Sequence, residues 1–162
     1  YTMTILSLDS GLERTGYAVF EYRQKEPILK TYGCIITSRD NILLKRFGTI
    51  AQRINVLIQK HSPEKIVFEQ LFFNLNKKTF VTVAQSQGVV ISQAIQHGVQ
   101  FDFITPLEIK LSLTGYGRAD KLQVQRMVKM LLKLEKIPKP DDTADAIACG
   151  LAYLSKQKFN QK

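Results

Sequence analysis

The chain has 162 residues, of which 44% are hydrophobic, and this size suits one domain with a substantial core. No apolar run approaches the roughly 20 residues that cross a bilayer, and the N-terminus lacks the basic and then apolar order of a signal peptide. We therefore expect a soluble, cytoplasmic protein with no membrane partner. The 23 Lys and Arg against 14 Asp and Glu leave a net charge of +9, which favours a polyanionic partner.

Three strands are predicted at the start of the chain, at residues 4–8, 16–22 and 28–37. Short polar connections join them, and this spacing is typical of an antiparallel meander. Met3 is expected to be the native first residue, with Tyr1 and Thr2 as a non-native remnant.

The rest of the chain alternates between helical and strand patterns. Helices are predicted at residues 40–61, 79–97, 106–113, 119–134 and 142–154, and strands at residues 65–71 and 101–105. This order predicts an α/β fold with a mixed five-stranded sheet, three antiparallel strands and then two parallel ones, and helices on both faces. We expect a single domain over residues 3–156, followed by a basic, frayed tail at residues 157–162.

Two acids stand at unusual places in the predicted strands. Asp9 follows the first apolar run and precedes Ser10 and Gly11, so it either opens a turn or carries a functional carboxylate at the C-terminal edge of the sheet. Glu69 lies in an apolar run of the buried-strand type, where an unpaired charge is costly. It is either a salt-bridged or exposed strand-end residue, or a metal ligand or catalytic acid beside Asp9.

Three further acids stand at the start of the last predicted helix. Asp142 suits an N-cap and Asp145 suits the third helical position, where a carboxylate interacts favourably with the helix dipole. Asp142 and Asp145 also share a helix face and can converge on a metal with Asp9 and Glu69. Asp141 and Asp145 share a face equally well, so the spacing leaves both pairs open.

Four carboxylates that meet in one place repel each other unless cations hold them together. Mg²⁺ prefers such hard oxygen ligands, Mn²⁺ can substitute for it, and two ions can activate a water and stabilise a leaving oxygen in phosphodiester hydrolysis. If four of the 14 acids hold metal, the remaining charge is 23 minus 10, or +13. The sequence thus favours a basic surface around an acidic metal site.

Other chemistries have little support. Cys34 and Cys149 are predicted to be buried, reduced thiols, and His61 and His97 lack zinc-site spacing. The segment from Gly115 to Gly117 lacks the preceding strand and third glycine of a nucleotide loop, so it is interpreted as a tight turn.

Four groups of residues, in order, resemble the RuvC family of Holliday junction resolvases, which have a ribonuclease H-like fold. They are Leu8-Asp9-x-Gly11 with Thr15-Gly16-Tyr17; Glu69-Gln70-Leu71-Phe72 with Asn76 and Gln85-x-x-Gly88; Thr114-Gly115-x-Gly117-x-Ala119-x-Lys121-x-Gln123-Val124; and Asp142-x-x-Asp145-Ala146. The resemblance extends from Ile5 to about Leu154.

The resemblance implies a homodimer that binds a four-way DNA junction and nicks two strands of like polarity symmetrically during recombination and repair. A branch-migration helicase is a further partner that the resemblance suggests. It implies that Asp9, Glu69, Asp142 and Asp145 are the metal-binding catalytic acids, and that Lys110 and Lys121 lie near the scissile phosphate. Phe72 corresponds to an aromatic residue that stacks near the junction crossover, and Phe73 can share that role. The other expected DNA contacts are Asn76, Lys77, Lys78, Gln85, Arg14 and Arg118.

The helix at residues 79–97 is the expected dimer interface, because Ala84, Ser86 and Gly88 would let another backbone approach. Ala84 also departs from the family pattern, which has glycine there; Ser10 stands in place of a usual proline and Gln87 in place of an arginine. None of these departures removes a ligand.

Three alternative functions differ in testable ways. A branched-DNA nuclease of broader specificity would also cut forks, flaps and three-way junctions, whereas a junction-binding module would not cut at all. An actin-like phosphotransferase also starts with a strand, an acid and a glycine, but it needs a second nucleotide-binding lobe, for which 162 residues leave little room.

Overall fold

Five strands form one mixed sheet in the order β3-β2-β1-β4-β5. The computed structural model describes the backbone of residues 2–71 and 77–160, with side chains up to residue 157. The strands are β1 (Thr2–Asp9), β2 (Arg14–Arg23), β3 (Glu26–Ile36), β4 (Lys65–Glu69) and β5 (Gln100–Ile104). β1 to β3 are antiparallel neighbours, whereas β1, β4 and β5 run parallel, as the sequence predicts.

The register brings the ends of three strands to one edge of the sheet. Asp9 pairs with Gly16 across β1 and β2, and Leu8 pairs with Phe68 across β1 and β4. Glu69 follows Phe68 directly, so the last residues of β1 and β4 emerge side by side. The parallel order β1-β4 therefore places two acids from distant parts of the chain next to each other.

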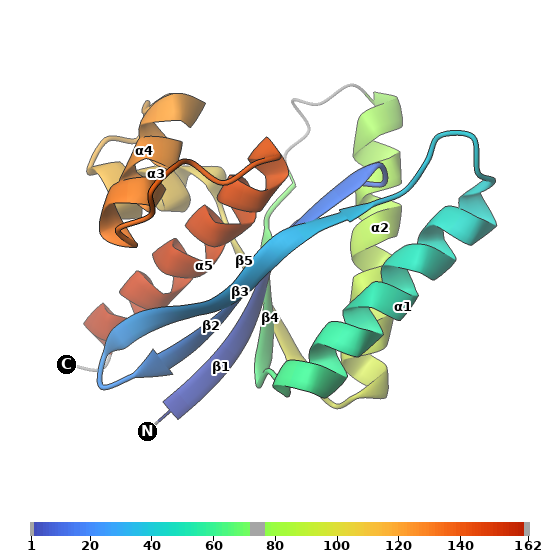
Figure 1. Cartoon of the computed structure of the whole chain (residues 1–162), viewed down its shortest axis with the longest axis horizontal. Coiled ribbons are helices and arrows are strands. Elements are labelled where there is room, and N and C mark those ends of the chain that lie inside the picture. The colour runs from blue at the N-terminus through green and yellow to red at the C-terminus, as the bar shows by residue number, and fades with distance from the viewer. Residues whose placement is uncertain (1, 72–76, 161–162) are drawn as a thin grey trace.

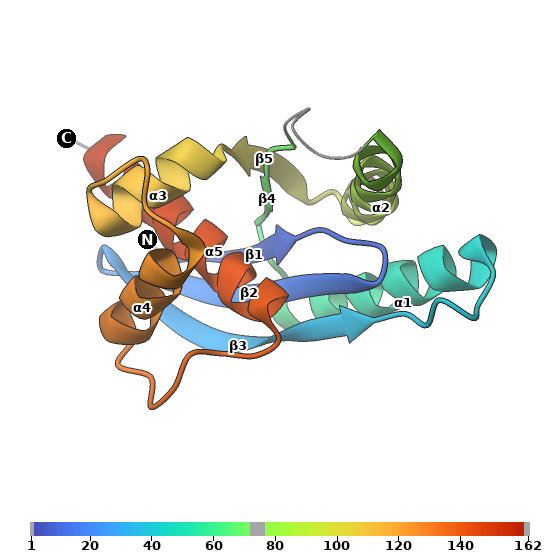
Figure 2. The same cartoon turned by 90° about the horizontal axis from the view of Figure 1, so that it is seen from above.

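Helices cover both faces of the sheet, as expected (Figure 1). α1 (Leu43–His61) and α2 (Lys77–Gln96) pack on one face, and α3 (Pro106–Thr114), α4 (Lys121–Leu131) and α5 (Asp141–Asn160) pack on the other. Each face buries its own apolar cluster, and the view in Figure 2 shows the sheet between the two helical layers. Burial of both faces explains why the central strands are almost uniformly apolar.

Local sequence signals set the boundaries of α3 and α4. Thr105 and Glu108 form a capping box at the start of α3, and Asp120 and Gln123 form another at the start of α4. Gly115, with a φ of 71°, ends α3 in the left-handed conformation. The glycine segment is thus the turn that the sequence predicts, and it directs α4 toward the N-terminus of α5.

α5 lies unusually close to the sheet because small residues line the contact. The Ser7 hydroxyl donates to the Ala146 carbonyl at 2.8 Å, and a Cβ at Gly150 would lie 2.5 Å from Phe20. At the other end of the contact, a Cβ at Gly16 would lie 1.9 Å from the Asp142 carbonyl oxygen. The first turn of α5 therefore rests directly on the backbone of β2.

Some expected boundaries and exposures are wrong. α5 continues to Asn160 rather than ending at residue 154, so the helix includes part of the expected tail. Lys156, just before that tail, forms an ion pair with Glu108 of α3 at 2.7 Å. Ser86 is buried, so it cannot belong to an exposed small-residue face of α2. Ala84 and Gly88 are exposed, as that face requires.

The two cysteines and one of the two histidines have defined surroundings. Cys34 is partly buried, Cys149 is buried, and both thiols are free. His97 hydrogen-bonds Asn55 across α1 and α2, with 2.6 Å between Nε2 and Oδ1. Among the described residues, no helix combines the length and hydropathy that a bilayer span requires.

Candidate active site

Four carboxylates from three parts of the chain line one cleft of about 700 Å³, which we call the acid cleft. Asp9 ends β1 and Glu69 ends β4, while Asp142 and Asp145 lie in the first turns of α5. The parallel pairing of β1 and β4 positions the first two, and the contact of α5 with β2 positions the others. The structure thus brings together all four acids that the sequence singles out.

Burial and mutual repulsion both raise the pKa values of acids in this cluster. Burial raises the pKa of Asp9 to about 8, and the nearby charges of Asp145, Glu69 and Asp142 contribute to this shift. Burial, together with Asp145, also raises the pKa of Glu69, and burial raises that of Asp145. Asp9 consequently retains a proton near neutral pH unless a cation compensates the cluster.

Lysines form one wall beside the acid cleft. Lys110 and Lys121 line an adjoining hollow of about 190 Å³ together with Glu69 and Asp145. The Lys121 ammonium lies 2.6 Å from Asp145 Oδ2. Burial alone would lower the pKa of Lys121, but the hydrogen bond to Asp145 and the negative charges of Asp141 and Asp9 raise it. Lys121 therefore stays charged.

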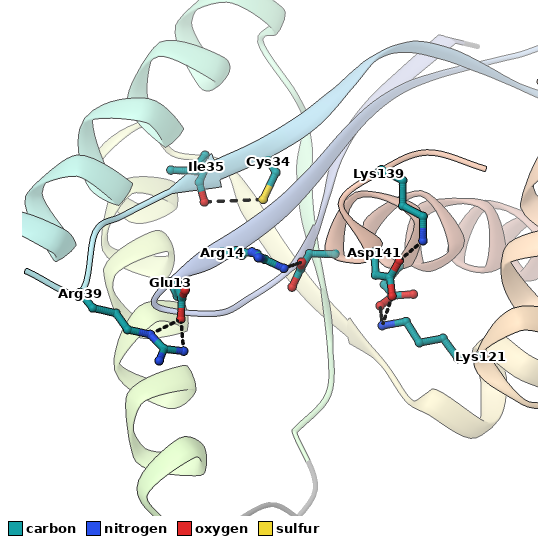
Figure 3. A network of polar contacts seen from close by, with 10 residues as sticks. Glu13, Arg14, Cys34, Ile35, Arg39, Lys121, Lys139 and Asp141 are labelled. Atoms are coloured by element: carbon teal, nitrogen blue, oxygen red, sulfur yellow. Dashed lines mark hydrogen bonds and ion pairs between the residues drawn. The ribbon is translucent and has the colours of Figure 1, made fainter. Parts of the chain in front are cut away.

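The structure distinguishes the two acid pairs that spacing leaves open. Asp142 and Asp145 line the acid cleft, whereas Asp141 pairs with Lys139 at 2.5 Å and lies 3.9 Å from Lys121. The hydrogen bond from Lys139 lowers the pKa of Asp141. Figure 3 shows Asp141 between the two lysines. Asp141 is thus an ion-paired neighbour of the cluster, not part of its lining.

Arg14 lies on the opposite side of the cleft from the lysines. Its guanidinium is 3.9 Å from Asp142 Oδ2, and its side chain is 54% exposed (Figure 3). Lys121 and Arg14 therefore each contact one acid of the cluster from outside.

The donor set fits a hard divalent cation by its chemistry, since all four groups are carboxylates in one cleft. Within the described part of the chain, however, no three His, Cys, Asp or Glu side chains already form a ligand group. Asp145 contacts Lys121 at 2.6 Å, and Asp142 lies 3.9 Å from Arg14.

The remaining predicted DNA contacts lie at the surface. Lys77, Lys78 and Gln85 are exposed on the first turns of α2, and Arg118 is exposed in the turn before α4. Phe72, Phe73 and Asn76 lie outside the described residues. The DNA-binding roles of these residues stay predictions from the family resemblance.

Sequence reasoning missed a contact at the rear of the cleft. Gln87 is buried in α2, lines the acid cleft, and donates from Nε2 to the Glu69 carbonyl at 3.1 Å. This bond ties α2 to the end of β4. Ser10, at another departure from the family pattern, also lines the cleft, and its buried hydroxyl has no hydrogen-bond partner among the described residues. Only the folded chain reveals these contacts, because polar burial is not evident from the sequence.

Known proteins resemble this chain over nearly its whole length. Residues 5–153 match the family model described as crossover junction endodeoxyribonuclease RuvC. A protein of that name from Finegoldia magna is 43% identical over 97% of this chain and 96% of its own, and one from Dictyoglomus thermophilum is 40% identical over 96% and 99%.

The solved structure of Thermus thermophilus RuvC is 27% identical, with a TM-score of 0.89 over 98% of this chain and 97% of its own. The same protein in complex with a Holliday junction substrate is 26% identical, with a TM-score of 0.90 over 98% and 96%. These matches confirm the ribonuclease H-like mixed sheet that the sequence predicts. The chain belongs to the RuvC family of crossover junction endodeoxyribonucleases.

Proposed function

We propose that this chain is a metal-dependent, structure-selective endodeoxyribonuclease that resolves four-way DNA junctions by paired, symmetrical nicks. The observation that carries the proposal is the acid cleft, in which Asp9, Glu69, Asp142 and Asp145 meet beside Lys110 and Lys121. Its relatives are named crossover junction endodeoxyribonucleases, and a similar structure holds a Holliday junction. Residues 3–156 would form the single nuclease domain.

Membership of this nuclease family carries a dependence on a divalent metal. We assign Mg²⁺ to the site, with two ions held by Asp9, Glu69, Asp142 and Asp145 and with Mn²⁺ as a substitute. When bound, the metal would activate a water for in-line attack on the phosphodiester and stabilise the leaving 3′ oxygen.

The side chains of the cleft prepare the chemistry in two ways. Asp9, whose pKa is about 8, releases its proton as positive charge enters the cleft and becomes a full ligand. Lys110 and Lys121 stand where ammonium groups can contact the oxygens of the scissile phosphate and offset its developing charge. Arg14 can hold a phosphate on the other side of the acids.

DNA contacts outside the cleft would add affinity without reading sequence. Lys77, Lys78, Gln85 and Arg118 are exposed on the elements that surround the cleft and can contact the backbone. Phe72 and Phe73 are proposed to stack on bases at the crossover, and Asn76 is proposed as a further DNA contact. Because contacts of this kind do not depend on base sequence, they suit recognition of the shape of branched DNA.

Paired nicks require two acid clefts, which a homodimer supplies. The proposed interface is the outer face of α2, where Val81 is 52% exposed and Ile95 is 68% exposed beside the small residues Ala84 and Gly88. Apolar side chains on this face would otherwise be left in water.

The test is cleavage of a synthetic four-way junction by wild-type protein and by Asp9→Asn. Asn is isosteric with Asp but cannot balance a divalent cation, so nicking should be abolished while junction binding is nearly unchanged. Asp141→Asn is the matched control, since Asp141 is a neighbouring acid outside the cleft lining and should leave nicking within a few-fold of wild type. Normal nicking by Asp9→Asn would show that the site is wrongly assigned.

The same assay separates the alternative functions. Mobile junctions, fixed junctions, forks and three-way junctions are compared at equal concentration, with and without Mg²⁺. Equal cleavage of forks and four-way junctions would support the broader branched-DNA nuclease, and binding without cleavage would support the junction-binding module.

A further inference from the structure

A second, basic cleft adjoins the acid cleft on the side of α1. This cleft, which we call the arginine groove, has a volume of about 700 Å³ and lies between the β1–β2 turn, the segment after β3, and the first turns of α2. It shares Gly11, Thr79, Val83 and Asp142 with the acid cleft, so the two are continuous. Its charged lining consists of Arg14, Arg39, Arg46, Lys78, Glu13 and Asp142.

Arg46 is held in place at the floor of this groove. Its Nε donates to the Thr37 hydroxyl at 3.0 Å, and that buried hydroxyl donates in turn to the Leu12 carbonyl. Among the described residues, no carboxylate lies within ion-pair distance of Arg46. One edge of the guanidinium is therefore anchored, while its charge remains uncompensated by any acid on the described part of the chain.

Arg39 lies at the mouth of the groove and is paired with the one glutamate of the lining. Its Nε and Nη2 contact Glu13 Oε2 at 2.6 and 2.5 Å, and its side chain is 80% exposed (Figure 3). An ion pair this exposed contributes little stability, because water screens it. A phosphate, which accepts bidentate hydrogen bonds from a guanidinium, can replace Glu13 as its partner.

We propose that the arginine groove binds the sugar-phosphate backbone of the DNA strand that continues from the scissile phosphate. Arg46 is the preoriented phosphate ligand, Arg14 marks the passage between the two clefts, and Arg39 exchanges Glu13 for a phosphate when DNA arrives. This inference rests on the proposed nuclease function, and it gives the cut strand a direction: away from the acids, along the groove between the β1–β2 turn and α2.

The experiment measures junction binding against salt concentration in Ca²⁺, together with cleavage in Mg²⁺, for three single variants. Arg46→Gln and Arg39→Gln should each weaken binding about three- to tenfold and reduce the salt slope by about 1, equally for all junction sequences. Glu13→Gln should have the opposite effect and bind about two- to fivefold more tightly, because it removes a competitor for Arg39. Lys25→Gln, at the β2–β3 turn at the far end of the sheet, is the charge-matched control and should bind as wild type.

The outcomes separate this inference from the proposed function. If wild-type protein nicks junctions but both arginine variants keep its affinity and salt slope, the groove does not bind the strand. If wild-type protein does not nick any branched DNA, the function itself is wrong, whatever the arginine variants do. Arg46→Gln is also checked by thermal melting, because it loses the Thr37 contact; Arg39→Gln and Glu13→Gln alter only a surface pair and decide the case if Arg46→Gln unfolds. Weaker binding by Glu13→Gln would contradict the exchange at Arg39.

Discussion

Gly16 controls how the two acids of α5 meet the acid at the end of β1. It pairs with Asp9 in the sheet register, and its backbone lies against the first turn of α5, where Asp142 and Asp145 begin. A side chain at this point would push against the helix backbone itself and not against a flexible side chain. We therefore expect Gly16→Ala to act on the geometry of the acid cleft without touching any ligand.

The size of the effect follows from the contact distances. A Cβ at residue 16 would lie 1.9 Å from the Asp142 carbonyl oxygen, whereas ordinary contact begins at 3.4 Å, so the two backbones must separate by about 1.5 Å. A misplacement of about 1 Å can reduce catalysis ~100-fold, and overpacking costs ~1–3 kcal/mol of stability. Gly16→Ala should thus fold, melt at a lower temperature, nick at least ~100-fold more slowly, and need more Mg²⁺ for half-maximal rate.

Gly150→Ala is the matched control for this variant. It overpacks the same helix against the same sheet, at 2.5 Å from Phe20 and Ser7, but about 12 Å further along α5 than Asp142, given a rise of 1.5 Å per residue. Both variants are compared by thermal melting, Mg²⁺ titration of cleavage, and junction binding in Ca²⁺. The reasoning is refuted if Gly16→Ala nicks at the wild-type rate and Mg²⁺ requirement, or if Gly150→Ala shows the same loss of rate at equal stability.

Two further predictions concern the charges of the acid cleft. Lys121→Met should bind Mg²⁺ more tightly, since the ammonium 2.6 Å from Asp145 no longer competes, yet it should nick ~100-fold more slowly at saturating Mg²⁺. Calorimetry with Mg²⁺ alone measures the affinity. Lys129→Met, exposed on the same helix, is the control. Because Asp9, with a pKa of about 8, holds a proton that the unfolded chain releases near 3.8, the thermal stability of the protein without added metal should fall as the pH rises from about 4 to about 8. Asp9→Asn should reduce the dependence of the melting temperature on pH. If the melting temperature of Asp9→Asn fell with pH as much as that of wild type, the raised pKa of Asp9 would be contradicted.

Much of the acid cleft was predictable because its members violate ordinary sequence patterns. Glu69 interrupts an apolar strand, and Asp9 ends one, so their positions alone indicate a common edge of the sheet. Asp142 and Asp145 needed the resemblance to the family, since Asp141 is equally well spaced from Asp145. The structure distinguishes Asp141 from Asp142 because Lys139, which precedes α5, pairs with Asp141. This contact depends on the geometry of the loop, which the periodicity of the sequence does not reveal.

The parts that sequence reasoning missed depend on contacts between distant segments. Arg39 and Arg46 resemble ordinary solvated arginines until the fold places them beside Arg14 in one groove. Gln87 looks polar and exposed in a helical pattern, but the packing of α2 against β4 buries it against the Glu69 carbonyl. Residue type predicts the chemistry of such groups, whereas their burial and partners come from tertiary structure.

The charges on the two sides of the acid cleft connect metal binding to DNA binding. In the metal-free chain, Lys121 and Arg14 each contact one carboxylate, Asp145 and Asp142 respectively. A divalent cation that bound these carboxylates would compete with both contacts. It would leave the Lys121 ammonium and the Arg14 guanidinium free at either side of the cleft. Both groups prefer a phosphate to water when the carboxylates are neutralised. Because coupling between two ligands is reciprocal, DNA that engaged Lys121 and Arg14 would strengthen metal binding by the same factor. Under the proposed function, we therefore expect each ligand to prepare the acid cleft for the other.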